Sequence, residues 1–455
     1  MKVKFVFILH FTLVTILFFS TGSYRNWPYK IESDGKYYYQ YLISIWYDGD
    51  LDFTNNYTAP ALPFMRTEID HYQFKNIISP QTGRPANLFT TGLAVLWAPF
   101  FILSYGLAYV LNSTGLTAIP LDGWGQYFQY TVMYAGVVYT GLTLYLIYQL
   151  LHRYFAENVA LIAAFLLFWG TNWAYYTIFE VSLSHAYDLF TLVLFLWLHW
   201  RALDRPGNSA FGLSGLAAAL HVLVRTQNVL TIAILVIYYF LTSDRSQNQT
   251  WERSIRPVIQ KYLLFTVAFV AGLTPLLLSN WYLFGNIFII PQGNDFLNLT
   301  DPAFYGVLLS GRNGLFSHHP VLWLGVAGLI LALIKAKAEQ PSLVRLGYPL
   351  LLVFVVQLYL NATVADWWGG HAFGQRRLLS SLLLFGLGFA YLQKYWYKIA
   401  PKSTALIGVV VALFILTNLY LTYIHLFLWG YDDPHDILKW MFHDGPILIY
   451  LQNFQ

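Results

Sequence analysis

The sequence predicts an all-α polytopic membrane protein, with about eleven transmembrane helices and a long first outer loop that carries juxtamembrane helices. Three observations lead to this prediction. Of the 455 residues, 57% are hydrophobic and only 11% are charged, which is typical of an integral membrane protein. Apolar runs of about 20 residues, long enough to span a bilayer, recur from one end of the chain to the other. The charged residues gather in the intervals between these runs.

The chain begins with an apolar run over residues 4–21, which Lys2 and Lys4 introduce. Basic residues favour the cytoplasmic end of a membrane span, so the N-terminus is predicted to be cytoplasmic. The run is longer than the apolar core of a usual signal peptide, and we interpret it as an uncleaved anchor. Residues 24–124 then form the first outer loop, and a loop of this length is usually functional.

Residues 92–111 are apolar enough to cross the membrane, although Pro99 lies in the middle of the segment. If this segment crossed, every later basic loop would lie outside, against the strong preference of lysine and arginine for cytoplasmic loops. We therefore predict a juxtamembrane or re-entrant helix on the outer side. The other interpretation is a true span with a weak charge bias.

The remaining spans alternate between the two sides of the membrane without further conflict. No internal repeat or low-complexity linker divides them, so residues 1–455 are interpreted as a single membrane domain with an outer C-terminal tail at 429–455. After the first helix, the predicted spans have boundaries good to a few residues. They lie near residues 125–150, 157–177, 185–202, 209–224, 227–242, 260–283, 319–335, 344–361, 377–394 and 403–427.

The composition also excludes some functions. The formal net charge is only +4, and the basic residues are scattered, so no nucleic-acid partner is indicated. The chain contains no cysteine, which excludes disulfide bonds and thiolate chemistry.

Carboxylates follow the first apolar run closely. Residues 36–47, which lie between these carboxylates in the sequence, are predicted to form a helix. One face of this helix is an apolar stripe rich in tyrosine and tryptophan, and Lys36, Gln40 and Ser44 lie on the other face. Such a stripe is typical of a helix in the membrane–water interface. The pattern predicts carboxylates held at the outer surface beside that helix, although a polar loop with Asp34 as an ordinary N-cap would show the same residues. The four acidic candidates are Glu32, Asp34, Asp50 and Asp52.

Several cations lie on the predicted outer side, where the positive-inside rule makes them rare. A cation between apolar helices is costly and usually has a partner, and a guanidinium can grip a phosphate through parallel hydrogen bonds. Arg376 and Arg377 begin a predicted helix, where the dipole disfavours cations but would favour a bound anion. We therefore expect Arg84, Arg225, Arg376 and Arg377 to bind the phosphate of a donor. Arg312 and His318, with His319 nearby, are expected to bind substrate on the same side, as are Asp50 and Asp52.

The stretch 365–377 is dense in residues common at carbohydrate sites. Tryptophan faces stack on sugar rings, and glycines let the backbone approach a ligand closely; an interfacial aromatic belt is the alternative. Trp368, His371 and Gln375 are the candidates here. His185 lies on another outer turn and is a further candidate, although a histidine at a helix start is more often a hydrogen-bonding residue.

No cofactor is predicted. An oxygen-rich group such as Glu32, Asp34, Asp50 and Asp52 is compatible with a divalent cation. These carboxylates show no regular ligand spacing, however, so the sequence indicates no metal site.

Parts of the chain resemble a known group of enzymes, the GT-C membrane glycosyltransferases. The resemblance is to the bacterial relatives of protein O-mannosyltransferases and of the lipid A aminoarabinose transferases. It is diffuse but covers most of the chain, and the Lys-Pro-Pro type motif of some relatives is absent. The stretches that carry it are Asp34-Gly-Lys-Tyr-Tyr-Tyr, Asp48-Gly-Asp-Leu-Asp-Phe-Thr-Asn55, Gly92 to Pro99, Ser184-His-Ala-Tyr187 and Phe373-Gly-Gln-Arg-Arg377.

The resemblance implies a polyprenyl-phosphate-linked sugar donor and an acidic base in the first outer loop, which maps onto Asp34 with Glu32 as the nearby rival. The expected reaction is transfer of the sugar, with inversion, to a hydroxyl or amine on the outer (periplasmic) face. The expected location is the bacterial inner membrane, as a multi-pass protein. Expected partners are the donor, a lipid, glycan or protein acceptor, and membrane lipids, with no nucleic acid.

Two other functions stay open. A transporter or flippase for a lipid-linked saccharide would show an inverted repeat and ionisable residues deep within spans, and neither is clear in the sequence. A non-catalytic membrane subunit would keep the same fold without needing Asp34.

Overall fold

The computed structural model describes residues 2–21, 30–58, 78–204, 207–242, 251–292, 296–339 and 341–427. Within these ranges the chain is helical, and its β-structure consists of two isolated bridges, Ile78 with Pro85 and Leu297 with Val364. The all-α prediction is therefore confirmed. The predicted outer tail at 429–455, and the parts of the first outer loop at 24–29 and 59–77, lie outside the described residues.

The helices cluster into two compact units. Unit 1 comprises Met1–Thr143, Tyr176–Ile232 and Phe240–Asn294, and unit 2 comprises Leu144–Tyr175, Ala233–Tyr239 and Asp295–Gln455. The expectation of one domain over the whole chain stays a prediction. Each unit is described separately below.

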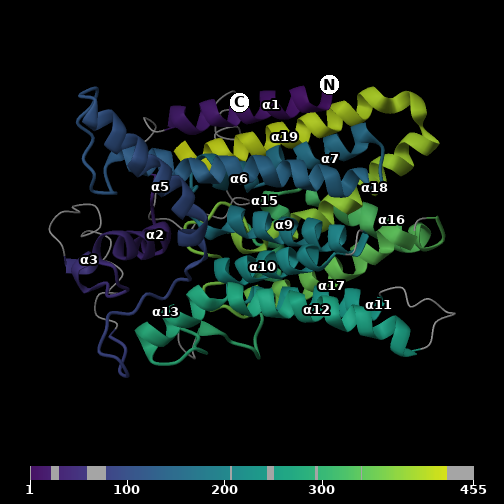
Figure 1. Cartoon of the computed structure of the whole chain (residues 1–455). Helices are drawn as coiled ribbons and strands as arrows, with labels where there is room; N and C mark the ends of the chain where they lie inside the picture. The colour runs from purple at the N-terminus through teal and green to yellow at the C-terminus, as the bar shows by residue number, and fades with distance from the viewer. Residues whose placement is uncertain are drawn as a thin grey trace, which may run out of the picture. The chain divides into compact units, whose positions relative to one another are not determined.

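Unit 1 holds the N-terminal helix and the segment that is predicted to form the first outer loop. Within it, α10 packs against both α9 and α12, and α5 packs against α2 and α10 (Figure 1). Its elements, some of which run on into unit 2, are α1 (Lys2–Ser20), α2 (Gly35–Ile43), the π-helix η2 (Ser44–Asp48), α3 (Thr54–Thr58), α5 (Gly92–Ser113), α6 (Gln126–His152), α8 (Trp173–Ile178), α9 (Ser184–Asp204), α10 (Asn208–Val224), α11 (Asn228–Thr242), α12 (Trp251–Gly272) and α13 (Thr274–Phe284).

Unit 2 is built around α18, which packs against α7, α16 and α17. The helices α16 and α18 approach most closely at Gly328 and Gly388, where a Cβ on Gly328 would lie 1.8 Å from the Gly388 carbonyl oxygen. Small residues permit such close contacts between membrane helices. The elements are α7 (Glu157–Trp169), α14 (Phe304–Leu309), α15 (Leu315–His318), α16 (Leu322–Glu339), α17 (Pro341–Thr363), the 3-10 helix η5 (Arg376–Ser381), α18 (Leu382–Ile399), η6 (Pro401–Ser403) and α19 (Thr404–Phe427).

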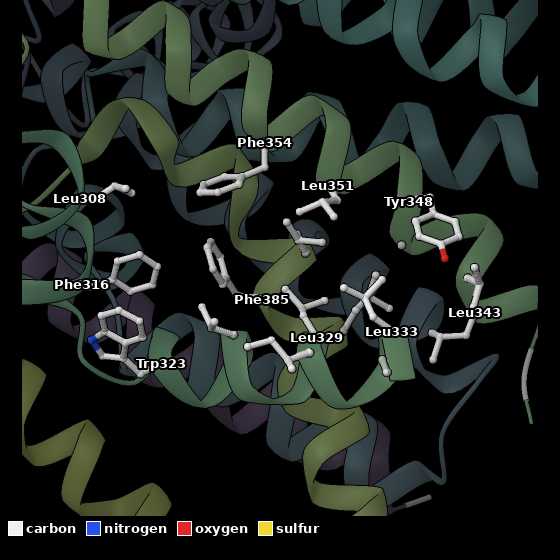
Figure 2. A pocket seen from close by; sticks show the side chains of 17 residues that line it. Leu308, Phe316, Trp323, Leu329, Leu333, Leu343, Tyr348, Leu351, Phe354 and Phe385 are labelled. Atoms are coloured by element: carbon white, nitrogen blue, oxygen red, sulfur yellow. The ribbon is translucent and has the colours of Figure 1, made fainter. Parts of the chain in front are cut away.

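An apolar cavity of about 350 Å³ lies among α16, α17 and α18 of unit 2 (Figure 2). It extends from Phe316 and Trp323 toward Leu343 and Tyr348. Its lining is hydrocarbon and aromatic, with no charged side chain. The cavity therefore suits a hydrocarbon chain, and no charged side chain lines it that could bind a phosphate.

The predicted spans fall on helical segments, but the one at 157–177 is divided, because α7 ends at Trp169 and the short helix α8 begins at Trp173. Among the described residues, seven helices are long and apolar enough to cross a bilayer, and four shorter ones, at 157–169, 209–224, 228–242 and 322–335, are also apolar. The predicted span at 185–202 is α9, which belongs to neither group and carries Asp188 and His199. The multi-pass architecture is thus confirmed, whereas the exact number of spans stays a prediction.

Helix α5 covers the segment that was predicted not to cross the membrane. It is one of the seven helices that are long enough to cross, and Pro99 lies inside it. Its start is tied to the end of α10 by a hydrogen bond from the Thr90 hydroxyl to the Val224 carbonyl (3.0 Å). Its middle lies beside the first half of α6, where the Tyr127 hydroxyl donates to the Ser104 carbonyl. Both contacts are compatible with a helix that crosses the membrane and with one that lies beside it, so the juxtamembrane assignment stays a prediction.

The helix after the first carboxylates differs from the expected interfacial helix. All nine residues of α2 are buried, including Lys36 and Gln40 of its polar face, whereas Ile45 and Trp46 of the predicted apolar stripe are exposed. The periodicity identified the helix correctly, but it did not predict that Lys36 and Gln40 of the polar face would be buried; the interfacial position stays a prediction. The reason for the burial is tertiary, because α5 and the loop before it cover α2, with Tyr38 packing edge-on against Phe89.

Candidate functional site

The first cluster of interest is the acidic turn, residues 32–35, at the start of α2. Its backbone doubles back sharply, with the Gly35 amide donating to the Glu32 carbonyl at 2.8 Å. Ser33 has φ = +48°, and it is the one non-glycine residue with positive φ in the described part of the chain. Such a conformation is strained for an L-residue and often marks a functional site. The turn carries two half-buried carboxylates, Glu32 and Asp34, with one residue between them.

Asp34 occupies the N-cap position of α2, but its side chain makes no capping hydrogen bond. The Ser33 hydroxyl lies 3.5 Å from the Asp34 carboxylate, at the limit of a hydrogen bond. The ordinary explanation for an aspartate at this position is a side-chain cap, and the geometry does not provide one. The Asp34 carboxylate therefore lies near the N-terminus of α2 without capping it, and the helix dipole there favours the ionised form of the carboxylate.

The acidic turn is attached to the start of α9 through Ser182. The Glu32 amide donates to the Ser182 hydroxyl at 3.0 Å, and that hydroxyl donates to the Glu32 carbonyl at 3.1 Å, across 150 residues of sequence. Three residues later, the His185 ring accepts a hydrogen bond at its Nδ1 from Arg225, at 2.9 Å. One short segment thus holds both the turn with its carboxylates and the guanidinium of Arg225.

A buried network of polar side chains lies at the helix ends next to Arg225 in the chain. The Asn228 side chain donates to the Asp188 carboxylate at 2.6 Å, and the His221 ring lies 3.4 Å from the same oxygen. The Thr191 hydroxyl lies 2.9 Å from the same His221 nitrogen, Nδ1. The network therefore joins the start of α9, the last turn of α10 and the start of α11, on either side of Arg225 in the chain.

Lys30 lies just before the acidic turn and is 5% exposed. Its ammonium donates to the Thr21 hydroxyl at 2.7 Å and to the Ile178 carbonyl at 3.3 Å, and it lies over the Phe18 ring. Burial lowers the pKa of Lys30 to about 8, against the opposing attraction of Glu32.

The other outer-loop candidates in unit 1 serve local contacts. Asp50 accepts a hydrogen bond from the Ser44 hydroxyl, and Asp52 accepts two from Thr54. The side-chain and backbone hydrogen bonds of Thr54, with a smaller effect of Arg84, lower the pKa of Asp52. Arg84 itself donates to the Tyr282 carbonyl at 2.7 Å and lies 3.9 Å from the centre of the Tyr282 ring. That contact joins the outer loop to the end of α13.

The second cluster is the tryptophan loop of unit 2, residues 364–377. The Arg377 Nη2 atom donates to both carboxylate oxygens of Asp366, at 2.8 and 2.9 Å, and its Nη1 donates to the Asp366 carbonyl. Arg312 lies 4.1 Å from the centre of the Trp368 ring, and the Asn313 side chain donates to the Trp368 carbonyl. The contact of Arg312 is thus with Trp368 and that of Arg377 is with Asp366, and the binding roles expected of these residues stay predictions.

The remaining candidates in unit 2 differ in exposure. His371 is exposed at the tip of the loop, whereas His318 and Gln375 are buried beneath it. The Gln375 side chain donates to the Trp367 carbonyl, and Arg376 lies beside Gly369, 3.4 Å from the position of an added Cβ. The buried Gln375 side chain therefore holds the loop backbone at Trp367, whereas His371 is exposed.

Metal binding receives no support from the described residues, where no group of three or more histidine, aspartate or glutamate side chains is placed to hold an ion. Sequence reasoning missed Gln129, Ser182, Asp188, His221 and Asn228. No short motif marks them, because their roles depend on contacts between helices that are far apart in the sequence.

Comparison with known proteins gives two kinds of match. Residues 126–277, about a third of the chain, match the family described as dolichyl-phosphate-mannose-protein mannosyltransferase. No curated protein matches the sequence.

Solved structures of the oligosaccharyltransferase from Archaeoglobus fulgidus also resemble this chain. The oligosaccharyltransferase AglB in complex with an inhibitory peptide and a dolichol-phosphate matches at a TM-score of 0.55 and 12% identity, over 99% of this chain and 59% of that chain. The apo form matches at 0.52 and 13%, over 99% and 60%, and the complex with Zn and sulfate at 0.51 and 14%, over 98% and 56%. This chain therefore spans about three fifths of the length of those proteins. Together with the helical architecture, these matches show that the chain has the fold of the GT-C membrane glycosyltransferases.

Proposed function

We propose that this protein is a membrane glycosyltransferase that moves a sugar from a polyprenyl-phosphate donor to a hydroxyl or amine acceptor. One observation carries the proposal. Ser182 and His185, three residues apart, bind the backbone of Glu32 and the guanidinium of Arg225, respectively. Transfer from a lipid phosphate needs a base for the acceptor and a cation for the leaving phosphate, and this segment anchors both kinds of group.

In the proposed step, Asp34 takes the proton from the acceptor hydroxyl. The acceptor oxygen forms a bond to the anomeric carbon from the face opposite the phosphate, while the bond from that carbon to the phosphate oxygen breaks. The electron pair leaves with the lipid phosphate, whose charge Arg225 stabilises. The guanidinium has five N–H donors and gives one to His185, so it can bind His185 and a phosphate together. The anomeric configuration is inverted.

The comparisons support this proposal at the level of fold. The matched family is described as acting with dolichyl-phosphate-mannose, and one similar structure contains dolichol-phosphate. A lipid-linked donor fits this chain because it offers a carboxylate turn, an arginine near it in the same unit, and many apolar helices. The sugar and the acceptor, whether lipid, glycan or protein, are not specified by these observations.

We place the reaction on the outer face of the bacterial inner membrane. The support is the positive-inside rule applied to the basic loops. Reporter fusions at Thr114 and His152 should lie outside and inside, respectively. A cytoplasmic signal at Thr114 would contradict the predicted position of residues 24–124.

The test of the reaction is Asp34→Asn. Asparagine begins a helix about as well as aspartate but cannot accept the proton, so transfer from a lipid-linked sugar should fall by at least about 10²-fold. The donor lipid that copurifies with the protein, identified by mass spectrometry, should remain bound. Asp301→Asn, on an exposed turn of unit 2, is the matched control and should keep full activity.

The reaction products distinguish a glycosyltransferase from a flippase or transporter. A glycosyltransferase releases free lipid phosphate in step with the glycosylated acceptor. A flippase or transporter would move the intact donor between leaflets and release none. Normal transfer by Asp34→Asn would reassign the base to Glu32 or Asp50.

A further inference from the structure

The acidic turn is held in its strained conformation by two buried side chains, one on α6 and the other in the turn that precedes α9. The first is Gln129 of α6, which is fully buried. Its Oε1 accepts hydrogen bonds from the backbone amides of Lys30 and Ile31, at 3.1 and 2.9 Å, and its Nε2 donates to the Trp124 carbonyl at 3.2 Å. Gln129 therefore fixes the two residues that lead into the turn.

The second is Ser182, which is 1% exposed. A hydroxyl has one proton to donate and two lone pairs to accept, and Ser182 uses both functions on the same residue, bonding the amide and the carbonyl of Glu32. The Glu32 carbonyl also accepts from the Gly35 amide. Both ends of one peptide segment are thus held by a single side chain, 150 residues away in sequence.

Gly35 shows how closely Ser182 approaches the turn. A Cβ at Gly35 would lie 2.3 Å from the Ser182 Oγ and 2.4 Å from its Cβ, so only glycine allows this contact. Ser33, between Glu32 and Asp34, keeps its positive φ. A strained residue persists only when its surroundings over-determine it, and here Gln129 and Ser182 supply that constraint.

We propose that Ser182 and Gln129 are positioning residues, which orient the carboxylate of Asp34 by fixing the backbone of residues 30–33. The inference rests on the proposed function, in which Asp34 is the base. Both side chains are buried and their hydrogen bonds go to backbone groups, so they act on the geometry of the turn rather than on a substrate. Since a misplacement of about 1 Å can cost about 10²-fold in rate, a loosened turn should slow transfer without weakening donor binding.

The test uses Ser182→Ala and Gln129→Met in the full-length protein. Each removes hydrogen bonds to the turn and keeps most of the side-chain volume. We expect kcat to fall by about 10-fold or more, while KM for the lipid-linked donor changes by less than about 3-fold. Ser214→Ala is the matched control. Ser214 is equally buried in unit 1, and its hydroxyl contacts the Phe211 carbonyl and the His199 ring rather than the residues around the acidic turn. It should keep normal kinetics.

A double-mutant cycle distinguishes positioning from general destabilisation. If Ser182 acts through Asp34, then Ser182→Ala should cost less than about 3-fold when it is added to Asp34→Asn. Where the residual transfer of Asp34→Asn is too low to measure, Asp34→Glu serves as the background, since its longer side chain already moves the carboxylate. A full additional loss in either background would overturn the proposal.

The other outcomes are equally decisive. Normal kcat in both Ser182→Ala and Gln129→Met would overturn the proposal, as would a loss that appears in donor KM alone. If Ser182→Ala fails to fold, Gln129→Met carries the same prediction from the opposite side of the turn. Normal transfer by Asp34→Asn itself would refute the proposed base, an outcome separate from any result at Ser182.

Discussion

In unit 2, the Arg377 guanidinium lies against the Asp366 carboxylate at 2.8 and 2.9 Å, and Arg312 covers the face of Trp368. In unit 1, Arg225 instead donates to the ring of His185, and the carboxylates of the acidic turn are held through backbone hydrogen bonds to Ser182. The tryptophan loop thus uses its charges to hold its own shape. The acidic turn is shaped by neutral groups.

This difference indicates which charges are available for chemistry. A phosphate at Arg377 would have to compete with Asp366 for the same donors, whereas a phosphate at Arg225 would meet a guanidinium whose hydrogen-bond partner is an imidazole. Backbone strain also distinguishes the two regions. The residue with positive φ in the acidic turn is a serine, whereas those in the tryptophan loop are Gly369, Gly370 and Gly374. Glycine adopts such angles without cost, so unit 1 alone stores strain in its described loop residues. The earlier prediction that Arg376 and Arg377 bind phosphate stays a prediction, with a competing structural role.

The largest expected effect comes from Gly35→Ala. The added Cβ would lie 2.3 Å from the Ser182 Oγ, so the turn must open and carry Asp34 away from its position. We expect transfer to fall by about 10²-fold or more. Gly106→Ala in α5, where an added Cβ meets nothing within 4 Å, is the control and should keep wild-type activity in the same assay.

The comparison variant in the tryptophan loop is Gly370→Ala. An added Cβ there also meets nothing within 4 Å, but φ is +68°, so the cost of this substitution should be backbone strain of about 1–2 kcal/mol. Equal losses at Gly35 and Gly370 would break the comparison.

Next in size is the contrast between Arg225→Lys and Arg377→Lys. Lysine keeps the charge but loses the planar fork of donors. At Arg225 we expect lipid-linked donor affinity to fall by about 10-fold, equivalent to about 1.4 kcal/mol. At Arg377 we expect donor affinity within about 3-fold of wild type and a lower thermal unfolding temperature, because the contact with Asp366 is weakened. Titration of a fluorescent lipid donor and thermal unfolding in detergent measure both. The reverse pattern would assign the phosphate to the tryptophan loop.

A smaller effect is expected from the side chain at Ser33. Its φ of +48° is tolerated by asparagine but disfavoured for β-branched residues. Ser33→Val should slow transfer by about 10-fold, since about 1–2 kcal/mol of strain favours a relaxed turn. Ser33→Asn should remain within about 2-fold of wild type. Similar rates for the two variants would show that the left-handed conformation is not needed for activity.

The smallest effect concerns pH. The pKa of Lys30 is lowered from 10.5 to about 8 by burial, so the folded state binds fewer protons than the unfolded state between these values. Stability from this group should therefore rise as the pH increases from about 8 to 10.5. Below about 8 it should not change, because Lys30 is protonated in both states. Thermal unfolding in detergent should show this slope in the wild type. Lys30→Met removes the titrating group, and a slope of the same size in that variant would show that Lys30 is not its source.

The sequence by itself determined the class of fold and the positions of the helices. Apolar runs of bilayer length locate each span because a helix satisfies its backbone hydrogen bonds within its own segment. The concentration of carboxylates after α1 was equally visible, since a charge just beyond a span needs no tertiary information to be noticed. Periodicity also found α2, although it could not tell that Lys36 and Gln40 would be buried by α5 and its preceding loop.

Only the tertiary structure decided how these charges are held. Ser182 meets Glu32 across 150 residues, and Arg225 meets His185 across 40. The availability of Arg377 changes once Asp366 is seen beside it, 11 residues away. The reason is physical: helix periodicity follows from backbone geometry within a few turns, whereas a hydroxyl or a guanidinium takes whichever partner the packing of distant helix ends brings within about 3 Å.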